Sequence, residues 1–227
     1  MTIPDRREPM FMIAPAVLAV IALMTAIHAI RVFVLDAATE NDFLSLFAFN
    51  PARFSAGLDA FVLASPVTYS LLHGDWVHLT VNVIWLAAFG SPLAYRIGTL
   101  RFAAFWAATA IAGALVQALA PGSENAWLIG ASGAVSGMVG AAARLGFVVN
   151  RKAVPPAFSA PLLSAVEALK RPNVLQFVAL WAIINLISGT GLLTGADSPA
   201  IAWQAHAGGF AAGFLGMALF DRPHRHN

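Results

Sequence analysis

The fold of this chain is decided by two short stretches, Gly130-Ala131-Ser132-Gly133 and Ala205-His206-Ala207-Gly208-Gly209-Phe210. Each lies early in a long apolar segment, so a hydroxyl and an imidazole fall among residues typical of a membrane interior. Polar side chains at that depth are costly and usually serve a function. A histidine that takes the proton of a serine makes the serine a nucleophile for acyl transfer. Together the two stretches indicate a protease whose active site lies inside a lipid bilayer.

The composition supports a membrane protein. Of the 227 residues, 59% are hydrophobic and only 11% are charged, whereas an average soluble domain has about 25% charged residues. The chain has no cysteine, which excludes disulfides, a thiolate nucleophile and thiolate metal ligands. A formal charge of +2 is too small and too scattered to indicate nucleic-acid binding.

Charged residues leave long uncharged windows between them. Six of these windows are close to the ~20 residues that a helix needs to cross a bilayer: 9–30, 76–95, 102–123, 125–143, 172–196 and 198–220. Six buried core helices of a soluble protein would have almost no polar face, so six spanning helices are the better interpretation. A shorter uncharged run, 60–74, is expected to belong to an interfacial loop.

Lysines and arginines predict the orientation. With the N-terminus inside, eleven of the thirteen fall on the inner side: Arg6, Arg7, Arg96, Arg101, Arg144, Arg151, Lys152, Lys170, Arg171, Arg222 and Arg225. The outer side has Arg31 and Arg53, and it holds seven acidic residues: Asp36, Glu40, Asp42, Asp59, Asp75, Glu124 and Asp197. Both termini are therefore expected in the cytoplasm. The first window is read as a retained anchor rather than a cleaved signal peptide.

This topology places four polar residues in one layer. Even-numbered helices enter from the outside, so His78 and Asn82 in the second, Ser132 in the fourth and His206 in the sixth all lie near the outer surface. Residues far apart in the sequence thus converge at similar depth, which predicts a functional site there.

Small residues explain how these helices approach each other. Gly133, Gly137 and Gly140 recur on the fourth helix, and Gly209, Gly213 and Gly216 follow His206 on the sixth. Such strips allow close helix contact in lipid. On their own they would equally suit a transporter or channel in which they only pack helices, but the strip on the sixth helix also directs His206 towards its partner.

From Phe49 to Gly216 the chain resembles the rhomboid intramembrane serine proteases. The family's GxSG signature stands at Gly130–Gly133, its AHxGG pattern at Ala205–Gly209, and its second-helix pattern at His73, His78 and Asn82. Two flanking stretches also match: Asn50-Pro51-Ala52-Arg53-Phe54, and Arg96-Ile97-Gly98 followed by Arg101-Phe102. A lone GxSG would be a weak signal, but three motifs in the right order and at matching depth are specific.

The resemblance implies a six-helix bundle and a role for each motif residue. Ser132 would be the nucleophile and His206 its general base, in a dyad without a third acid. The backbone N–H of Ser132 and the side chains of His78 and Asn82 would form the oxyanion hole. The spacing agrees with these roles, because His78 and Asn82 are four residues apart and so share a helix face. Ser132 lies near a helix N-terminus, which places backbone N–H groups beside the developing negative charge. Five glycines are expected to pack the helices around the site: Gly130, Gly133, Gly137, Gly209 and Gly213.

Two positions depart from the family pattern. Ala94 stands where a glutamate often precedes the arginine of the Arg96-Ile97-Gly98 stretch, which is expected to weaken inner-side packing. Ser136 stands four residues after the nucleophile, where an aromatic ring often stacks on the base. We expect Phe210 or another neighbour to orient His206 instead.

Other polar residues have simpler interpretations. His28 is expected to reach the interface from the first helix. A metal site formed by His73, His78 and His206 is conceivable, but no carboxylate-containing histidine motif supports it, and we predict neither metal nor cofactor. Residues 149–171 are expected to form a cytoplasmic loop, and residues 35–74 short amphipathic helices in the outer leaflet.

We therefore predict an all-α membrane protein with one rhomboid-like domain over residues 1–227, its core at about 10–220 and short cytoplasmic tails. Its expected function is hydrolysis of peptide bonds in or beside transmembrane segments of other membrane proteins. The short termini favour a bacterial inner membrane over an organelle, with the site open to the outer face. The sequence leaves the oligomeric state open. Two alternatives remain: an inactive rhomboid-like protein that binds client helices, and a small transporter.

Overall fold

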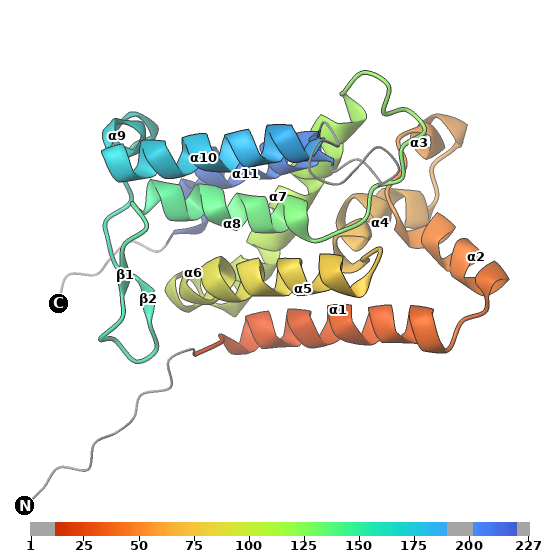
Figure 1. Ribbon diagram of the computed structural model, residues 1–227, viewed down its shortest axis with the longest axis horizontal. Helices are drawn as coiled ribbons and strands as arrows, with labels where there is room; N and C mark the ends of the chain where they lie inside the picture. Colours follow the sequence, from red (N-terminus) through yellow and green to blue (C-terminus); the bar gives the residue numbers. More distant parts are fainter. Residues whose placement is uncertain (1–11, 190–201, 222–227) are drawn as a thin grey trace, which may run out of the picture.

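The computed structural model describes residues 12–189 and 202–221. Long helices run back and forth along one axis, and shorter elements cover both ends (Figure 1). The elements, in chain order, are α1 (Pro15–Phe33), α2 (Ala37–Phe47), α3 (Ala52–Ala56), α4 (Ala60–Thr68), η1 (Tyr69–Leu71), α5 (Trp76–Trp85), η2 (Leu86–Gly90), α6 (Ser91–Ile97), α7 (Thr99–Ala118), α8 (Ser132–Arg144), β1 (Val149–Asn150), β2 (Ala157–Phe158), α9 (Ala165–Lys170), α10 (Pro172–Gly189) and α11 (Trp203–Phe220).

Each of the six uncharged windows contains a helix. Four helical segments are long and apolar enough to cross a membrane: α1, the continuous run Trp76–Ile97, α7 and α10. The other two windows hold α8, which has 13 residues, and α11, which has 18 but includes Gln204 and His206. The structure thus gives four candidate membrane spans among the described residues, and six crossings stay a prediction.

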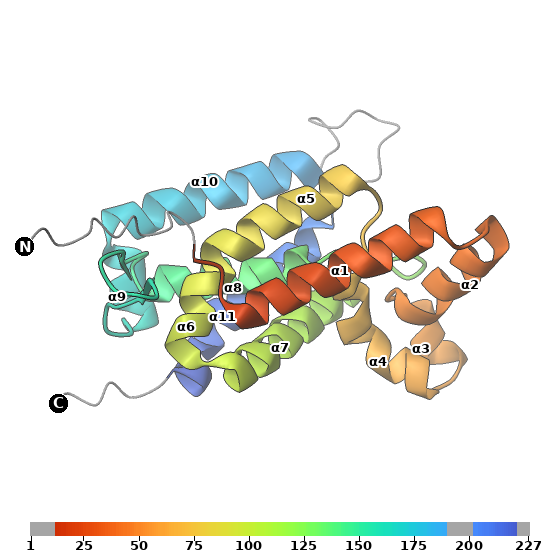
Figure 2. The same cartoon turned by 90° about the horizontal axis from the view of Figure 1, so that it is seen from below.

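The central helix is α8, with α5, α7, α10 and α11 around it (Figures 1 and 2). Every residue of α8 after Ser132 is buried. By contrast, α1 and α10 expose about half of their large apolar side chains on the outside, for example Leu18, Leu180 and Ile183. An apolar exterior is what a lipid environment requires, whereas an interior helix can be short and rich in small residues.

The window 125–143 is helical over only part of its length. Residues 125–131 are not helical, and α8 begins at Ser132 itself. The preceding segment is instead paired with the connection between α2 and α3, where Phe49 and Leu128 exchange backbone hydrogen bonds of 3.1 and 2.8 Å. The helix is therefore shorter than its window.

Glycine contacts join α8 to α11. A Cβ built on Gly209 would overlap the carbonyl oxygen of Gly133, and one on Gly213 would overlap that of Gly137. On the α8 side, a Cβ on Gly140 would overlap the carbonyl oxygen of Phe210. The predicted strip is therefore present over two turns but ends there, because a Cβ on Gly216 would meet nothing within 4 Å.

One end of the bundle contains the short elements α2, α3, α4 and η1, where the sequence predicts short helices in residues 35–74 (Figure 1). The charge pattern predicts that this end faces outward, and it is called the outer end below. Two of the short elements begin with an aspartate cap: Asp36 accepts from the N–H of Thr39, and Asp59 from that of Val62. At the other end, β1 and β2 form an antiparallel hairpin, the one departure among the described residues from the all-α prediction.

Arg96 connects the segments at the inner end. Its guanidinium donates to both carboxylate oxygens of Asp221 at 2.7 and 2.8 Å, and to the carbonyl oxygens of Phe158 and Ala160. Tyr95 beside it donates to the carbonyl oxygen of Ile13. The start of α1 and the end of α11 therefore adjoin α6 at one end of the bundle. Ala94, at the position where a glutamate is common in the family pattern, is buried. The carboxylate that pairs with Arg96 comes from Asp221 instead.

Several predicted charges lie outside the described residues: Arg6, Arg7, Asp197, Arg222 and Arg225. The two ends of the bundle are distinct, but which of them faces the cytoplasm stays a prediction from the charge pattern. The extent of the single domain also stays a prediction.

The glycine contacts predict opposite effects of two alanine substitutions on α11. Gly209→Ala places a methyl group against the Gly133 carbonyl and should destabilise the protein by about 1–3 kcal/mol, as overpacking does. Gly216→Ala has open space and should leave stability unchanged or raise it slightly, since alanine favours helix. Thermal unfolding of both variants in detergent measures the difference; equal midpoints would contradict the close contact.

Candidate active site

Three helix N-termini meet at the outer end of the bundle, those of α5, α8 and α11 (Figure 1). They carry the predicted residues His78 and Asn82, Ser132, and His206 respectively. Asp75 caps α5 by accepting from the N–H of His78 at 2.8 Å, which lowers the pKa of the Asp75 carboxyl below its ordinary value. The residues that the sequence placed in one layer thus lie on neighbouring elements.

Ser132 is positioned by the sharp turn before it. Gly130 has φ of 120°, which side-chain-bearing residues rarely adopt, and its N–H donates to the carbonyl oxygen of Tyr69 at 3.0 Å. The next residue, Ala131, donates its N–H to Nε2 of His73 at 3.5 Å. As the first residue of α8, Ser132 has an N–H that the helix itself does not use. The Ser132 hydroxyl and an N–H that the helix does not use therefore belong to the same residue.

Ser132 and His206 are hydrogen-bonded. Ser132 Oγ donates to Nε2 of His206 at 2.7 Å across the α8–α11 contact, and both side chains are partly exposed. This distance allows direct proton transfer from the hydroxyl to the imidazole. The arrangement has the geometry of an activated nucleophile and its base.

The second nitrogen of His206 contacts a residue that the sequence analysis missed. Nδ1 donates to Oδ1 of Asn185 on α10. Asn185 is a carboxamide within the otherwise apolar stretch 177–187 of the window 172–196, and that polarity was the available signal. Hydrophobic periodicity could not single it out, because α10 has no distinct polar face that would mark one side as functional.

His78 faces the nucleophile from α5. The position of a Cβ on Gly130 would lie 2.7 Å from His78 Nε2 and 3.7 Å from Ser132 Oγ, so imidazole and hydroxyl border the same small volume. Gly74 donates its N–H to His78 Nδ1 at 3.4 Å, which leaves the proton of a neutral ring on Nε2. His78 can therefore donate towards the nucleophile.

Asn82 lies one turn further along α5 and is buried. Its amide nitrogen donates to the carbonyl oxygen of His78 at 2.9 Å, so one of its two N–H groups is used within its own helix. The second N–H is the one that could serve a substrate.

Two predicted packing positions have other contacts than expected. Gly130 precedes α8 and makes room for His78, rather than packing α8 against α11. Phe210 stacks on Trp181 with ring centroids 4.6 Å apart, so among the described residues its ring faces α10 and not His206. With Ser136 buried in α8, the imidazole is held by Asn185.

His28 does not reach the interface as expected. It is 1% exposed and packs edge-on against Trp76 with centroids 4.6 Å apart. Nearby, Arg31 donates to the carbonyl oxygen of His73 at 2.7 Å and to Glu40 at 2.9 Å. The ring of His73 packs edge-on against the ring of His78, with centroids 5.1 Å apart, and so supports it. This arrangement anchors the first outer loop behind the site.

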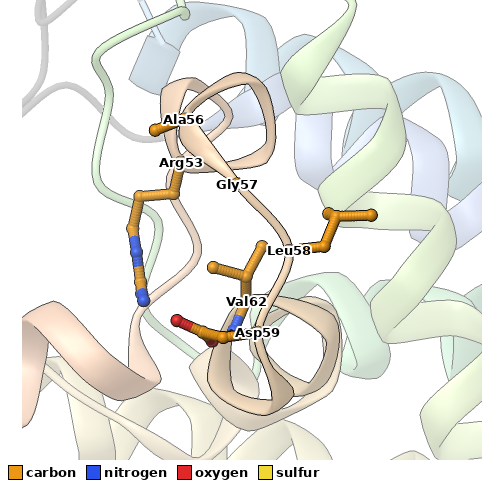
Figure 3. Close-up of a pocket in the computed structure, with 6 residues that line it drawn as sticks. All are labelled: Arg53, Ala56, Gly57, Leu58, Asp59 and Val62. Carbon is orange, nitrogen blue, oxygen red and sulfur yellow. The ribbon is translucent and has the colours of Figure 1, made fainter.

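A hollow of about 320 Å³ lies in the first outer loop, lined by Arg53, Ala56, Gly57, Leu58, Asp59 and Val62 (Figure 3). Its polar side chains serve the local backbone: Arg53 donates to the carbonyl oxygens of Ser45 and Leu46, and Asp59 caps α4. The hollow contains none of the predicted site residues. In residues 12–189 and 202–221, no group of three histidine or acidic side chains could hold a metal.

Fold and site define a helical membrane protein with a serine–histidine pair at one end of its bundle. The model of one family, the rhomboid domain, matches residues 62–222. The chain therefore belongs to the rhomboid family and is an integral membrane protein.

Two curated relatives are similar over about two thirds of the chain. RHOMBOID-like protein 5 of Arabidopsis thaliana is 30% identical over 153 residues, which is 67% of this chain and 42% of that protein. RHOMBOID-like protein 4 of the same plant is 31% identical over 157 residues, 67% of this chain and 33% of that protein. The match thus spans less than half the length of either relative.

The burial of His73 predicts a loss of stability in acid. Burial, and to a smaller extent the neighbouring His78, lowers the pKa of His73 to about 3 from 6.5. An unfolded chain therefore binds a proton that the folded protein does not, so stability is unaffected above about pH 6.5 and falls by up to about 1.4 kcal/mol per unit below it. Compared with wild type, His73→Gln should show a flatter decline in melting temperature from about pH 7 to about pH 5. Parallel declines would contradict a neutral, buried His73.

Proposed function

We propose that the protein is an intramembrane serine endopeptidase, which hydrolyses peptide bonds in or beside transmembrane segments of other membrane proteins. The observation that carries this proposal is the 2.7 Å hydrogen bond from Ser132 Oγ to His206 Nε2 within an apolar helical bundle. Membership of the rhomboid family supports it.

In the proposed mechanism, Ser132 Oγ attacks the carbonyl carbon of the scissile peptide while His206 Nε2 takes the hydroxyl proton. The resulting oxyanion receives hydrogen bonds from the Ser132 N–H, from His78 Nε2–H and from the second N–H of Asn82. His206 then protonates the departing amine, which leaves an acyl group on Ser132. Water, activated by His206, attacks this ester and restores the hydroxyl.

The membrane constrains the substrate. A helix in lipid has all its backbone carbonyls hydrogen-bonded, so a peptide bond must leave the helix before it can reach Ser132. Substrates are therefore transmembrane segments that unwind easily, with the small residues before the cut that the family resemblance implies. No cofactor takes part in the proposed chemistry.

The proposed orientation follows the arginine and lysine bias, with both termini in the cytoplasm and the site open to the outer face. For a bacterial protein the membrane would be the inner membrane. Both relatives are plant proteins, so the compartment rests on the sequence pattern alone.

One observation favours a second function, an inactive protein that binds client helices. Asn82 directs one amide N–H into its own helix, so only the other could serve an oxyanion. A serine-reactive covalent probe separates the two: it should label wild-type protein at Ser132, whereas a client-binding protein would stay unlabelled. A transporter would also stay unlabelled.

Removal of either dyad residue should abolish cleavage. We expect Ser132→Ala and His206→Ala each to lose turnover of a model transmembrane substrate in proteoliposomes, with the double variant no worse than either single. Ser136→Ala, which changes a serine one helical turn away, is the matched control and should stay active. Substantial turnover by well-folded Ser132→Ala would rule out the mechanism.

The oxyanion donors should affect kcat more than substrate binding. His78→Ala and Asn82→Ala are each expected to lower kcat by at most about 10²–10³, with redundancy reducing the loss, and the double variant to fall below both. Apparent KM should change little. If lost thermal stability accounts for all the lost activity, the two residues brace the outer loop and do not stabilise the oxyanion.

A further inference from the structure

Asn185 is held at both ends of its carboxamide. Its Nδ2 donates to the carbonyl oxygen of Trp181 at 2.7 Å, and its Oδ1 accepts from His206 Nδ1. A backbone carbonyl only accepts, so the group facing Trp181 must be the amide nitrogen. The amide oxygen therefore faces His206, and the orientation of the carboxamide is determined by its own helix.

An amide oxygen also only accepts, which determines the proton positions on the imidazole. Nδ1 of a neutral His206 must carry the proton, so Nε2 has the free lone pair. Nε2 is the nitrogen that accepts from Ser132 Oγ at 2.7 Å. In the other tautomer, Nε2 would carry a proton and could not take one from the serine.

Aromatic contacts hold α10 in the position this requires. Phe177, Trp181 and Asn185 follow at intervals of four and share one face of the helix. The ring of Phe177 packs on Phe147 with centroids 4.5 Å apart, and that of Trp181 stacks on Phe210 of α11 at 4.6 Å. Ile184, next to Asn185, points away from the bundle and is 50% exposed. The inward face of α10 thus ends in the carboxamide.

We propose that Asn185 is a positioning residue that fixes the tautomer and the ring orientation of His206, so that serine, histidine and asparagine act as a unit. This inference rests on the proposed protease function. It assigns to α10 a role in the chemistry and accounts for a base that, among the described residues, has neither a carboxylate partner nor the stacked aromatic common in the family.

The test compares three variants of α10 in the full-length protein. Asn185→Leu removes both hydrogen bonds and should lower kcat by about 10- to 100-fold, the scale of a misplaced catalytic group, with KM nearly unchanged. Ile184→Ala, which alters the neighbouring outward side chain, is the matched control and should have wild-type kcat. Thermal unfolding of all variants shows whether α10 stays packed.

Asn185→Asp supplies a readout that a purely structural role would not move. A carboxylate accepts the same hydrogen bond and also stabilises the imidazolium, so activity should persist while the acid limb of the kcat/KM profile shifts to higher pH. His78 is the other titratable group that faces His206, and it is unchanged in every variant. An unshifted limb would overturn the inference.

The tautomer can also be observed without any substrate. In protein with ¹⁵N-labelled histidine, the His206 signals, assigned by their loss in His206→Gln, should show a protonated Nδ1 and a bare Nε2. In Asn185→Leu the same signals should show a mixture of tautomers. If wild type and Asn185→Leu show the same tautomer, Asn185 does not set it, even if Ser132→Ala proves inactive and the protease function holds. If cleavage survives Ser132→Ala, the protease mechanism fails while the tautomer result is unaffected.

Discussion

The direct backbone contact between α8 and α11 is the constraint on which the rest of the structure depends. The carbonyl oxygens of Gly133 and Gly137 occupy the space that side chains on Gly209 and Gly213 would fill. Helices in lipid gain little from burying apolar surface against each other, so close packing of small residues must hold them together. The same approach brings the first turn of α8 within hydrogen-bond distance of the first turn of α11. The contact that holds α8 against α11 therefore also brings the serine and the histidine together.

Polar groups at this end of the bundle form a chain of contacts that begins in the last turn of α1 and ends at the turn before Ser132. Arg31 holds the backbone of His73, His73 accepts from the N–H before the nucleophile, and His78 lies against Gly130. The two hydrogen bonds in this chain pair a guanidinium N–H with a carbonyl and an imidazole nitrogen with a backbone N–H, which lowers the cost of burying those groups. The turn before Ser132 is thus fixed on the side away from α11, which leaves its hydroxyl free to meet His206.

Much of this arrangement could be predicted from the sequence. Charge-free windows located the long helices, and motif order together with depth identified the family and placed Ser132, His78 and His206 near one another. Other features depend on directions that apolar windows do not encode. Gly216 continues the small-residue spacing but faces open space, and His28 turns inward to Trp76. The window 125–143 gave no sign that its first part is extended, because loops near a membrane surface can be as apolar as helices.

Asn185 shows most clearly what the sequence could not reveal, and why a neutral residue suits this position. A carboxylate behind the histidine would hold the same tautomer, but burying its charge in an apolar bundle would cost free energy whenever the imidazole is neutral. A carboxamide holds the ring with no net charge, and its spare nitrogen is satisfied by the carbonyl of Trp181 in the same helix. In the proposed mechanism, the cost is weaker stabilisation of the imidazolium that would form when Ser132 is deprotonated. Compared with a carboxylate, an orienting amide would thus stabilise the transition state less, but the folded protein buries no extra charge.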